Sequence, residues 1–490
     1  MPANRPDATP NVDAVPSEQI TADICVIGAG SGGLTVAATA AAFGQSVVLI
    51  EKHKMGGDCL NYGCVPSKAL IAAGKRAHAM RTASKFGIAD VNPEIDLAAV
   101  NDHVRSVIAA IEPNDSVERF TGLGVRVILA AGRFVEKSTV VAGEYRIKAR
   151  RFVVATGSSP FVPPIPGLNS VPYFTNETIF DNRDRLHHLI VIGGGPIGME
   201  MSQAHRRLGS RVTVLEGSKA LGRDDPELSK IVLEELTAEG IDLRQGSKVE
   251  RVEGGLGRVL VHVASGDQKY VVEGTHLLVA VGRKVNVSEL GLEAAGIRYD
   301  KRGIKVNKGL RTSNRRVYAI GDVVGQQQFT HVANYHAGIV IRRVLFRIPA
   351  KVNPNIISWT TYTDPELANV GLSEEAARKA TGGKINVLRW PYMENDRAQA
   401  ELETIGHVKV VTDKSGKILG ATIVGAKAGE LIQMWSLAIS QKLKIKAMTE
   451  WISPYPTLSE INKRAAYRYY ATAPGSPALR KIIGFLAKFG

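Results

Sequence analysis

The chain has 490 residues, of which 44% are apolar and 22% charged, and its formal net charge is +15. This length is too great for one ordinary hydrophobic core and predicts about three domains. The positive charge does not indicate a nucleic-acid partner, because most basic residues are scattered among acidic ones and no nucleic-acid motif accompanies them. A basic balance equally suits an enzyme that attracts phosphorylated cofactors.

The N-terminal segment and the cysteine count bear on where the protein works. Residues 1–21 lack an apolar core of the signal-peptide kind, so we expect a disordered leader there. Three cysteines are too few for a disulfide framework, and the cytoplasm is the expected compartment. No membrane span is predicted, because the least polar run, residues 34–50, is accounted for by one helix and one strand.

A dinucleotide-binding pattern occupies residues 23–51. A strand (23–27) leads into a glycine-rich turn, a helix of small residues (34–43) follows, and a second strand ends at Glu51. In such a unit the glycines let the backbone approach a pyrophosphate, the helix N-terminus offers N–H groups, and the carboxylate binds a ribose hydroxyl. The glycines of the turn are Gly28, Gly30 and Gly33.

The same unit returns at residues 188–217 with equal spacing. Strand, glycine turn, helix and second strand recur in the same order, and Glu216 is the acidic residue at the end. The glycines of this turn are Gly193, Gly195 and Gly198. Two units in one chain predict two bound dinucleotides, each on a doubly wound α/β sheet.

Two further apolar runs are expected to return to these sheets, and a third run gives another nucleotide-related signal. Residues 152–160 and 277–283 both read as buried strands that end in a glycine turn, and residues 317–322 read as a strand that runs into Gly321 and Asp322. An Asp in that place lies at the rim where ligands bind, although a turn aspartate explains it equally well. From residue 356 onward, alternating segments predict an α+β domain suited to contact between subunits.

The stretch at residues 56–68, GGDCLNYGCVPSK, follows the first nucleotide unit. It carries Cys59 and Cys64, and a thiolate beside an electron-poor ring is stabilised. Two cysteines with four residues between them can also close a small ring. Zinc is the structural alternative, but it needs four ligands and nothing nearby supplies the other two. Cys25, in the first strand, suits a small core residue.

Together these motifs resemble the FAD-dependent pyridine nucleotide–disulfide oxidoreductases, and among these the chain is most similar to dihydrolipoamide dehydrogenases and mercuric reductases. The resemblance implies FAD in the first unit, NADH or NADPH in the second, and a homodimer whose active site is shared between subunits. The implied fold is α/β, with two doubly wound dinucleotide-binding domains and an α+β C-terminal dimerisation domain. The expected limits are 22–160 with 287–355 for FAD, 161–286 for NAD(P), 356–475 for the dimerisation domain and 476–490 for a basic amphipathic tail.

The resemblance also implies roles for individual residues. Electrons pass from NAD(P)H through FAD and a Cys59–Cys64 disulfide to a thiol-reactive acceptor, with Cys64 nearer the flavin and Cys59 attacking the substrate. Lys68 matches the lysine beside the flavin, and Glu200 matches its ion-pair partner. The implied FAD-binding residues are Gly28, Gly30, Gly33, Glu51, Gly57, Asp58, Ala155, Thr156, Gly157, Gly321, Asp322, Thr330, His331, Val332 and Ala333. The implied NAD(P)-binding residues are Gly193, Gly195, Gly198, Glu216 and Gly282.

The choice between the two nicotinamide cofactors rests on Glu216. A carboxylate at the end of that strand accepts hydrogen bonds from the ribose hydroxyls and repels a 2′-phosphate, so NADH is favoured over NADPH. Arg223, a few residues on, would soften that preference.

Two departures from the family pattern leave the acceptor open between a metal ion and a disulfide. Family members that reduce disulfides carry a His where this chain has Tyr455, paired with the Glu that matches Glu460, and a tyrosine is a poor base at neutral pH. Mercuric reductases do have a Tyr there, but they end in a cysteine pair, and this chain has no cysteine after Cys64. The alternatives are a flavin reductase for quinones or other small oxidants, and a redox-sensing flavoprotein of low turnover.

Residues 476–490 form a basic amphipathic pattern. The apolar residues Leu479, Ile482, Ile483 and Leu486 recur at helical spacing, with basic residues between them. Such a helix either packs on its own domain, which its short length favours, or makes a weak contact with a membrane surface.

Overall fold

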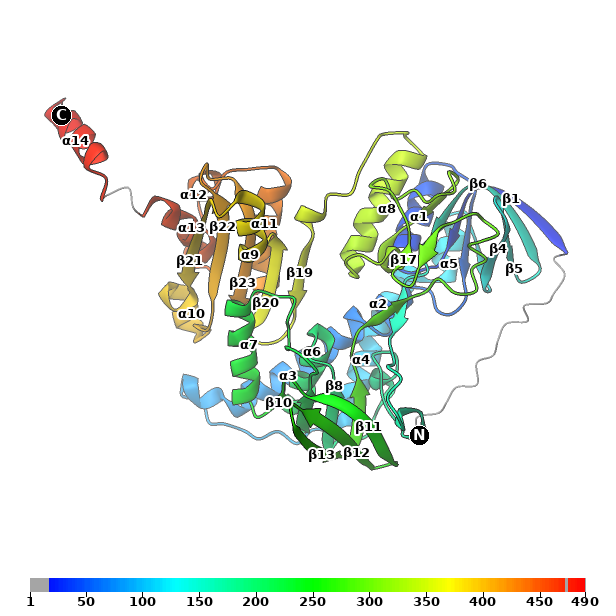
Figure 1. Ribbon diagram of the computed structural model, residues 1–490, viewed down its shortest axis with the longest axis horizontal. Coiled ribbons are helices and arrows are strands. Elements are labelled where there is room, and N and C mark those ends of the chain that lie inside the picture. The colour runs from blue at the N-terminus through cyan, green and yellow to red at the C-terminus, as the bar shows by residue number, and fades with distance from the viewer. Residues whose placement is uncertain (1–16, 472–474, 490) are drawn as a thin grey trace. The chain divides into compact units, whose positions relative to one another are not determined.

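The structure is a computed structural model in which residues 17–471 and 475–489 are described (Figure 1). The chain divides into two compact units. The first comprises the described residues up to Lys219 and the segment Gly240–Val352, and the second comprises Ala220–Glu239 and the described residues from Asn353 onward. Each unit has its own sheet-based core.

A seven-stranded sheet forms the centre of the first unit. Its strands are β1 (Glu18–Ile27), β2 (Val47–Glu51), β3 (Val125–Leu129), β4 (Gly132–Glu136), β5 (Thr139–Ala142), β6 (Tyr145–Val154) and β18 (Val317–Ala319). They pair in the order β3-β2-β1-β6-β5-β4, and β18 also pairs with β6. Strands β1, β2, β3, β6 and β18 are parallel, whereas β4 and β5 form an antiparallel edge.

Burial on both faces of this sheet explains why the first strand reads as an unbroken apolar run. Ile24 belongs to a core shared with helices α1 (Ser31–Ala42) and α8 (Thr330–Val344), and Cys25 belongs to a second core on the other face. Successive side chains of a strand point to opposite faces, so both sets must be apolar. Cys25 is fully buried, as the sequence predicted.

The second sheet of this unit repeats the parallel arrangement. Its strands are β8 (His188–Ile192), β9 (Arg211–Leu215), β10 (Asp242–Arg244) and β14 (His276–Val279), in the order β10-β9-β8-β14, and helix α6 (Pro196–Arg207) joins β8 to β9. The smaller sheets consist of β11 (Lys248–Gly255), β12 (Arg258–Ser265) and β13 (Gln268–Gly274), of β7 (Ser158–Pro160) with β15 (Arg283–Val285), and of β16 (Tyr299–Asp300) with β17 (Gly303–Ile304). The prediction of two doubly wound α/β arrangements is confirmed.

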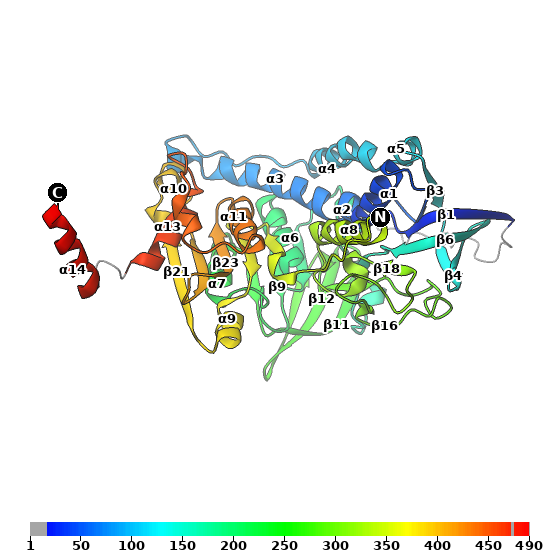
Figure 2. The ribbon, with the colours of Figure 1, turned by 90° about the horizontal axis from the view of Figure 1, so that it is seen from above.

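Four helices lie between β2 and β3: α2 (Gly57–Asn61), α3 (Cys64–Arg81), α4 (Leu97–Ile111) and α5 (Val117–Gly122). Figure 2 shows the long α3 beside α4, and α3 also packs on α6. Gly74 permits this second contact, because a Cβ there would lie 3.1 Å from the backbone oxygen of Ala204. The close approach matters because α3 begins at Cys64 and α6 carries Glu200.

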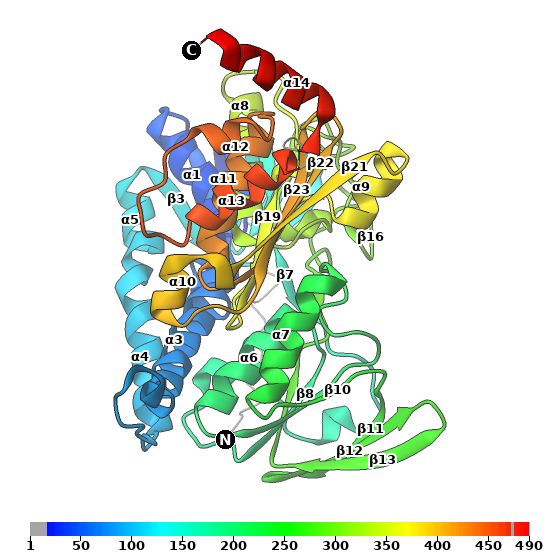
Figure 3. The same cartoon turned by 90° about the vertical axis from the view of Figure 1, so that its left-hand side faces the viewer.

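The second unit is built on a five-stranded antiparallel sheet (Figure 3). Its strands are β19 (Ser358–Thr361), β20 (Glu366–Gly371), β21 (Ile385–Pro391), β22 (His407–Asp413) and β23 (Ile418–Gly425), in the order β19-β20-β23-β22-β21. Its helices include α9 (Glu374–Thr381), α10 (Asp396–Glu401), α11 (Ala428–Ser440), α12 (Ala447–Glu450), α13 (Glu460–Tyr467) and α14 (Pro477–Leu486). The buried Trp435 of α11 donates a 2.8 Å hydrogen bond to Asn462 of α13 and fixes these two helices together.

Helix α7 (Pro226–Ala238) belongs to the second unit, although it follows β9 in the sequence. It packs against β20 and β23. The expected domain limits stay predictions, including 161–286 for the nucleotide-binding domain, a range that contains the segment Ala220–Glu239 of the second unit.

Two expectations about the ends of the chain are corrected. The predicted leader is too long, because residues 18–21 belong to β1, where they pair with β6 and where Ile20 is buried; residues 1–16 lie outside the described residues. No residue of α14 is buried, so the expectation that this helix packs on its own domain is also wrong. Among the described residues, no helix has both the length and the apolar character that crossing a membrane requires.

A buried ion cluster fixes α7 to the sheet of the second unit. The ammonium group of Lys409, on β22, lies 2.8 Å from carboxylate oxygens of Asp225, Glu227 and Glu374. The side chains of Lys409 and Asp225 are each only 5% exposed. A buried charge is tolerated only when it is paired, so this single cation holds several carboxylates in place.

The substitution Lys409→Met is expected to destabilise the protein by about 3–5 kcal/mol, because it leaves the buried Asp225 carboxylate without its counter-charge. Urea denaturation at fixed protein concentration measures the effect. The matched control is Lys446→Met, because Lys446 pairs with Glu450 at 3.3 Å while both side chains are more than half exposed. That control is expected to change stability by no more than about 0.5 kcal/mol. Equal effects of the two substitutions would contradict a role for the buried cluster.

Candidate active site

The first glycine turn has the shape of a phosphate cradle. Gly28 has φ of +104°, and a Cβ there would lie 2.4 Å from the carbonyl oxygen of Ala155. A Cβ at Gly33 would lie 1.9 Å from the carbonyl oxygen of Gly28, whereas a Cβ at Gly30 would meet nothing within 4 Å. A side chain at Gly28 or Gly33 would therefore collide with the protein's own backbone. A side chain at Gly30 would not, so the lack of one there leaves the backbone open to a ligand.

The second turn repeats this geometry. A Cβ at Gly193 would lie 2.5 Å from the oxygen of Ala280, one at Gly198 would lie 2.0 Å from the oxygen of Gly193, and one at Gly195 would meet nothing within 4 Å. The caps of α1 and α6, Gly30 and Gly195, have no side chain that could accept from the first N–H groups. Both helix N-termini can thus receive a pyrophosphate, and the two turns fit dinucleotides.

Two glutamates are held by the same pair of contacts. Glu51, at the end of β2, accepts hydrogen bonds from the N–H groups of Ala29 at 2.7 Å and His53 at 2.8 Å. Glu216, directly after β9, accepts from the N–H groups of Gly194 at 2.7 Å and Ser218 at 2.8 Å. Each carboxylate is thus fixed beside its glycine turn, where a ribose hydroxyl of a dinucleotide would lie.

The two cysteines lie together on consecutive helices. Cys59 is in α2, Cys64 is the first residue of α3, and both thiols are free. The hydrogen bond from Cys59 is the main cause that lowers the pKa of Cys64 to about 6; the Thr330 hydroxyl and the charge of Lys68 add to it, against the effect of burial. The same hydrogen bond, together with burial, raises the pKa of Cys59. One thiol is therefore prepared as a thiolate while the other keeps its proton.

Two elements distant in sequence complete the surroundings of Cys64. Thr330, the first residue of α8, places its hydroxyl oxygen 3.3 Å from the Cys64 sulfur. Lys68, one turn further along α3, donates a 2.7 Å hydrogen bond to Glu200 of α6. The Glu200 side chain is only 7% exposed, so it fixes the position of the lysine. The predicted pair of Lys68 and Glu200 is formed in the structure.

An arginine that the sequence analysis did not single out connects the predicted FAD-binding residues. Arg283 lies 3.0 Å from the carboxylate of Asp58 and donates to the hydroxyl of Ser158 at 2.7 Å. Ser158 in turn donates to Asp322 at 2.6 Å, and burial raises the pKa of Asp322. In the sequence, the signal for Arg283 was its place directly after Gly282, at the end of a predicted buried strand.

The remaining predicted FAD-binding residues come from four segments of the first unit. Ala155, Thr156 and Gly157 follow β6, and the Thr156 hydroxyl donates to the carbonyl of Asn286 at 2.8 Å. Gly57 lies against Gly30, since a Cβ at Gly57 would lie 2.8 Å from the Gly30 Cα. Gly321 donates its N–H to the buried His336 of α8 at 3.2 Å. Residues 330–333, which include His331, Val332 and Ala333, form the first turn of α8, whose cap has no side-chain hydrogen bond and leaves N–H groups available.

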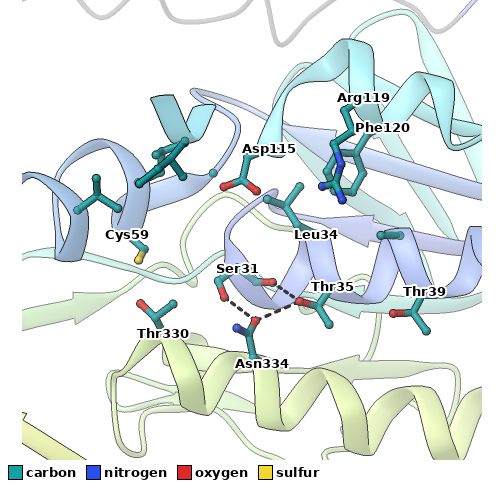
Figure 4. Close-up of a pocket in the computed structure, with 15 residues that line it drawn as sticks. Ser31, Leu34, Thr35, Thr39, Cys59, Asp115, Arg119, Phe120, Thr330 and Asn334 are labelled. Carbon is teal, nitrogen blue, oxygen red and sulfur yellow. Dashed lines mark hydrogen bonds between the residues drawn. The ribbon is translucent and has the colours of Figure 1, made fainter. Parts of the chain in front are cut away.

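A pocket of about 430 Å³ opens beside Cys59 (Figure 4). Ser31 and Thr35 from α1 and Asn334 from α8 line it with polar groups, and the Asn334 carbonyl accepts from both hydroxyls, at 2.5 Å and 3.1 Å. Asp115 and Arg119 add one charge of each sign, and burial raises the pKa of Asp115. A small polar or charged molecule could reach the Cys59 sulfur here.

Tyr455 and Glu460 lie in the second unit. Tyr455 is 72% exposed and donates a 2.9 Å hydrogen bond to Asp396, which raises its pKa. The bond between Tyr455 and Pro456 is cis. Glu460 forms an ion pair with Arg464 at 2.9 Å. The acidic partner of Tyr455 in this structure is thus Asp396, which the motif did not indicate.

Known proteins share this arrangement. The family described as pyridine nucleotide-disulphide oxidoreductase matches residues 22–337, and its dimerisation domain matches residues 357–466. The chain belongs to the pyridine nucleotide-disulphide oxidoreductases. It is 35% identical to a mercuric reductase of Bacillus cereus over an alignment of 450 residues. This alignment covers 91% of the present chain and 71% of the reductase.

Two further relatives differ in their named activity. A dihydrolipoyl dehydrogenase of Chlamydia muridarum is 32% identical over 471 residues, covering 94% of this chain and 99% of that one. The structure of a Cu(II) complex of the HOCl-induced flavoprotein disulfide reductase RclA from Escherichia coli superposes with a TM-score of 0.81 at 26% identity, covering 90% of this chain and 99% of that one. The chain is therefore an FAD-dependent oxidoreductase that uses a pyridine nucleotide.

The Cys64 thiolate is expected to form at a pH about three units below that of an ordinary thiol, because its pKa is lowered from 9.0 to about 6. Below pH 6 the group gains its proton, and above it the thiolate persists. Samples labelled with ¹³C at cysteine Cβ give this pKa by NMR in the reduced holoenzyme, and Cys25→Ala and Cys59→Ser assign the signals. Thr330→Val should move the midpoint to higher pH, because it removes one donor to the sulfur.

Thr35→Val is the matched control for that measurement. Thr35 lines the same pocket, but the partners of its hydroxyl are the Ser31 carbonyl and the Asn334 side chain rather than a sulfur. An unchanged midpoint in Thr330→Val, or an equal shift in both variants, would contradict the assignment.

Proposed function

We propose that the enzyme carries two electrons from NADH through FAD and the Cys64–Cys59 pair to a soft metal ion that binds thiolates, of the Hg(II) type. The arrangement of the two thiols carries this proposal: Cys64 lies beside Thr330, on the helix whose Lys68 pairs with Glu200, and Cys59 lines the polar pocket. Bound FAD supplies the relay between the nicotinamide hydride and the sulfur pair. The glycine turns, Glu51, the Arg283 network and the first turn of α8 would hold FAD, and the second turn with Glu216 and Gly282 would hold the nicotinamide cofactor.

The chain's own residues divide the work at the thiols. Cys64 stays a thiolate next to Thr330 and Lys68, and the charge of Lys68, fixed by Glu200, favours negative charge in its neighbourhood. Cys59 keeps its proton until an acceptor arrives in the polar pocket. A soft metal ion replaces that proton directly, because thiolate sulfur is its preferred ligand. The metal is thus a substrate, and among the described residues no cluster of three His, Cys, Asp or Glu side chains is placed to hold a resident ion.

The acceptor preference follows from Tyr455. A disulfide substrate needs a group that returns a proton to the leaving thiol, and a phenol bonded to Asp396 with a raised pKa is poorly suited to that task. Reduction of a bound metal ion releases no thiol and needs no such acid. A disulfide therefore ranks second as acceptor.

A homodimer is part of the proposal. The matched dimerisation domain supports it, as do large apolar side chains exposed on the second unit, among them Ile452 at 89%, Met393 at 62% and Leu437 at 61%. Exposed apolar groups of this size suit an interface between subunits. The cytoplasmic location expected from the cysteine count remains a proposal.

Anaerobic titration with NADH is expected to show uptake of about four electrons per flavin, two for FAD and two for the cysteine pair. Cys59→Ser should reduce uptake to about two and abolish metal reduction, because one sulfur cannot store an electron pair as a disulfide. The control Cys25→Ala removes the buried cysteine and should leave both values unchanged. Full turnover with quinones after Cys64→Ser would instead favour a flavin reductase in which the pair is incidental.

An acceptor screen with Hg(II), Cu(II), lipoamide, glutathione disulfide and quinones separates the candidate substrates. We expect kcat/KM for Hg(II) to exceed that for either disulfide. Tyr455→His should raise disulfide turnover by about tenfold or more, because it supplies a proton donor with a pKa near neutrality. Efficient lipoamide turnover by the unaltered enzyme would overturn the metal assignment while leaving the electron path intact. Negligible turnover with every acceptor would favour the redox-sensing alternative.

Glu216 is expected to set the preference for NADH. Glu216→Gln removes the charge that repels a 2′-phosphate, so the ratio of kcat/KM for NADH to that for NADPH should fall by about tenfold. Steady-state kinetics with both cofactors measure this ratio. Glu51→Gln, the equivalent change in the first unit, serves as the comparison and should leave the ratio unchanged. A wild-type preference for NADPH would contradict the assignment.

A further inference from the structure

Helix α14 stands out because none of its residues is buried. Ile482, Ile483 and Leu486 are each 55–58% exposed, and Phe485 and Phe489 are 59% and 73% exposed. The two phenylalanine rings contact each other with centroids 5.1 Å apart. The side chain of Ser476 caps the helix by accepting from the Leu479 N–H at 3.4 Å, so the segment is a formed helix with a large apolar surface.

The apolar residues of α14 occupy one side of the helix. Successive residues of a helix are rotated by about 100° around its axis. Viewed along the axis, the apolar side chains lie within an arc of about 160° that has Phe485 at one edge and Ile483 at the other. Leu479, Ile482 and Leu486 lie between these edges. Arg480 and Lys481 lie just outside the two edges of this arc. Gly484 and Lys488 lie on the opposite side, and Ala487 lies between Ile483 and Arg480. Arg480 and Lys481 are thus the basic side chains nearest to the apolar face.

The charge of the surrounding sequence has a single sign. No Asp or Glu follows Glu460, whereas the same stretch contains Lys463, Arg464, Arg468, Arg480, Lys481 and Lys488. A surface that binds a soluble protein usually carries both positive and negative side chains. A surface that binds anionic lipid headgroups needs only positive ones, as in this segment. When such a helix binds a bilayer, its apolar face is buried at the boundary between headgroups and acyl chains. The basic side chains at the edges of that face reach up to the charged headgroups.

We propose that α14 is a membrane-surface helix that binds an anionic lipid bilayer in the plane of the interface. The apolar arc supplies the buried surface, and the bordering Arg480 and Lys481 supply the attraction to anionic lipid. The proposal is independent of the acceptor and of the electron path. A single helix of this length gives reversible binding that salt weakens, because part of the attraction is electrostatic.

Co-sedimentation of the full-length holoenzyme with large unilamellar vesicles tests the proposal. Binding to vesicles of phosphatidylcholine with 30% phosphatidylglycerol is expected to exceed binding to pure phosphatidylcholine by about tenfold or more at low salt. The double substitution Ile482→Glu with Ile483→Glu should reduce the partition coefficient by about tenfold or more, because it places charge within the apolar arc. Arg480→Gln with Lys481→Gln should reduce it by about fivefold per charge, with anionic vesicles only.

The matched control is Leu256→Glu, which places the same charge at a leucine that is 78% exposed in the turn between β11 and β12. This control should bind vesicles as the unaltered protein does. NADH oxidation with a soluble acceptor should be unchanged in all the α14 variants, which reports that they are folded.

Three outcomes would overturn the proposal. Absence of binding to anionic vesicles would do so directly. Loss of binding in the charge variant together with full binding in the Ile482→Glu/Ile483→Glu variant would show electrostatic adsorption without insertion. A change of oligomeric state in that apolar variant, measured by light scattering and without any effect of vesicles, would assign the helix to a second copy of the chain.

Discussion

The contact between the Cys59 and Cys64 thiols is the interaction on which the proposed chemistry depends. Because Cys59 donates and Cys64 accepts, the pKa of Cys64 falls to about 6 and that of Cys59 rises. The pair therefore has a direction before any ligand binds, with a thiolate at one end and a protonated thiol in the pocket at the other.

The fold supplies the conditions for this bond from three separate places. Helix α3 begins at Cys64 and puts the sulfur at a helix N-terminus, where negative charge is favoured. Helix α8 brings Thr330 to the same sulfur, and α6 brings Glu200 to Lys68. Gly74 lets α3 and α6 approach closely enough for that ion pair. A short motif thus acts only through contacts with segments far away in the sequence.

The sequence predicted the parts of the structure that local rules determine. Both glycine turns and the two glutamates followed from their spacing alone, and the structure gives the two units matching hydrogen bonds. Arg283, Asn334 and Asp396 could not be predicted, because each acts on a residue from another part of the chain. The same holds for the ion cluster between α7 and Lys409, because it joins residues on elements far apart in the sequence. Where a pattern is periodic the sequence is sufficient, and where a contact is long-range it is not.

The Tyr455 contact shows how a long-range interaction can select chemistry. The phenol donates its hydrogen bond to Asp396, so it presents a lone pair rather than a hydrogen to any other neighbour. A phenol held in this way can accept a hydrogen bond or contact a cation, but its raised pKa makes it a poor acid toward a departing thiolate. The number of protons that each acceptor needs then distinguishes a disulfide from a metal ion. A disulfide takes up protons as its two sulfurs leave, whereas a thiophilic metal ion displaces the proton of Cys59 and takes the electron pair without a leaving group. The residue that replaces the family histidine thus suits the acceptor that needs no acid.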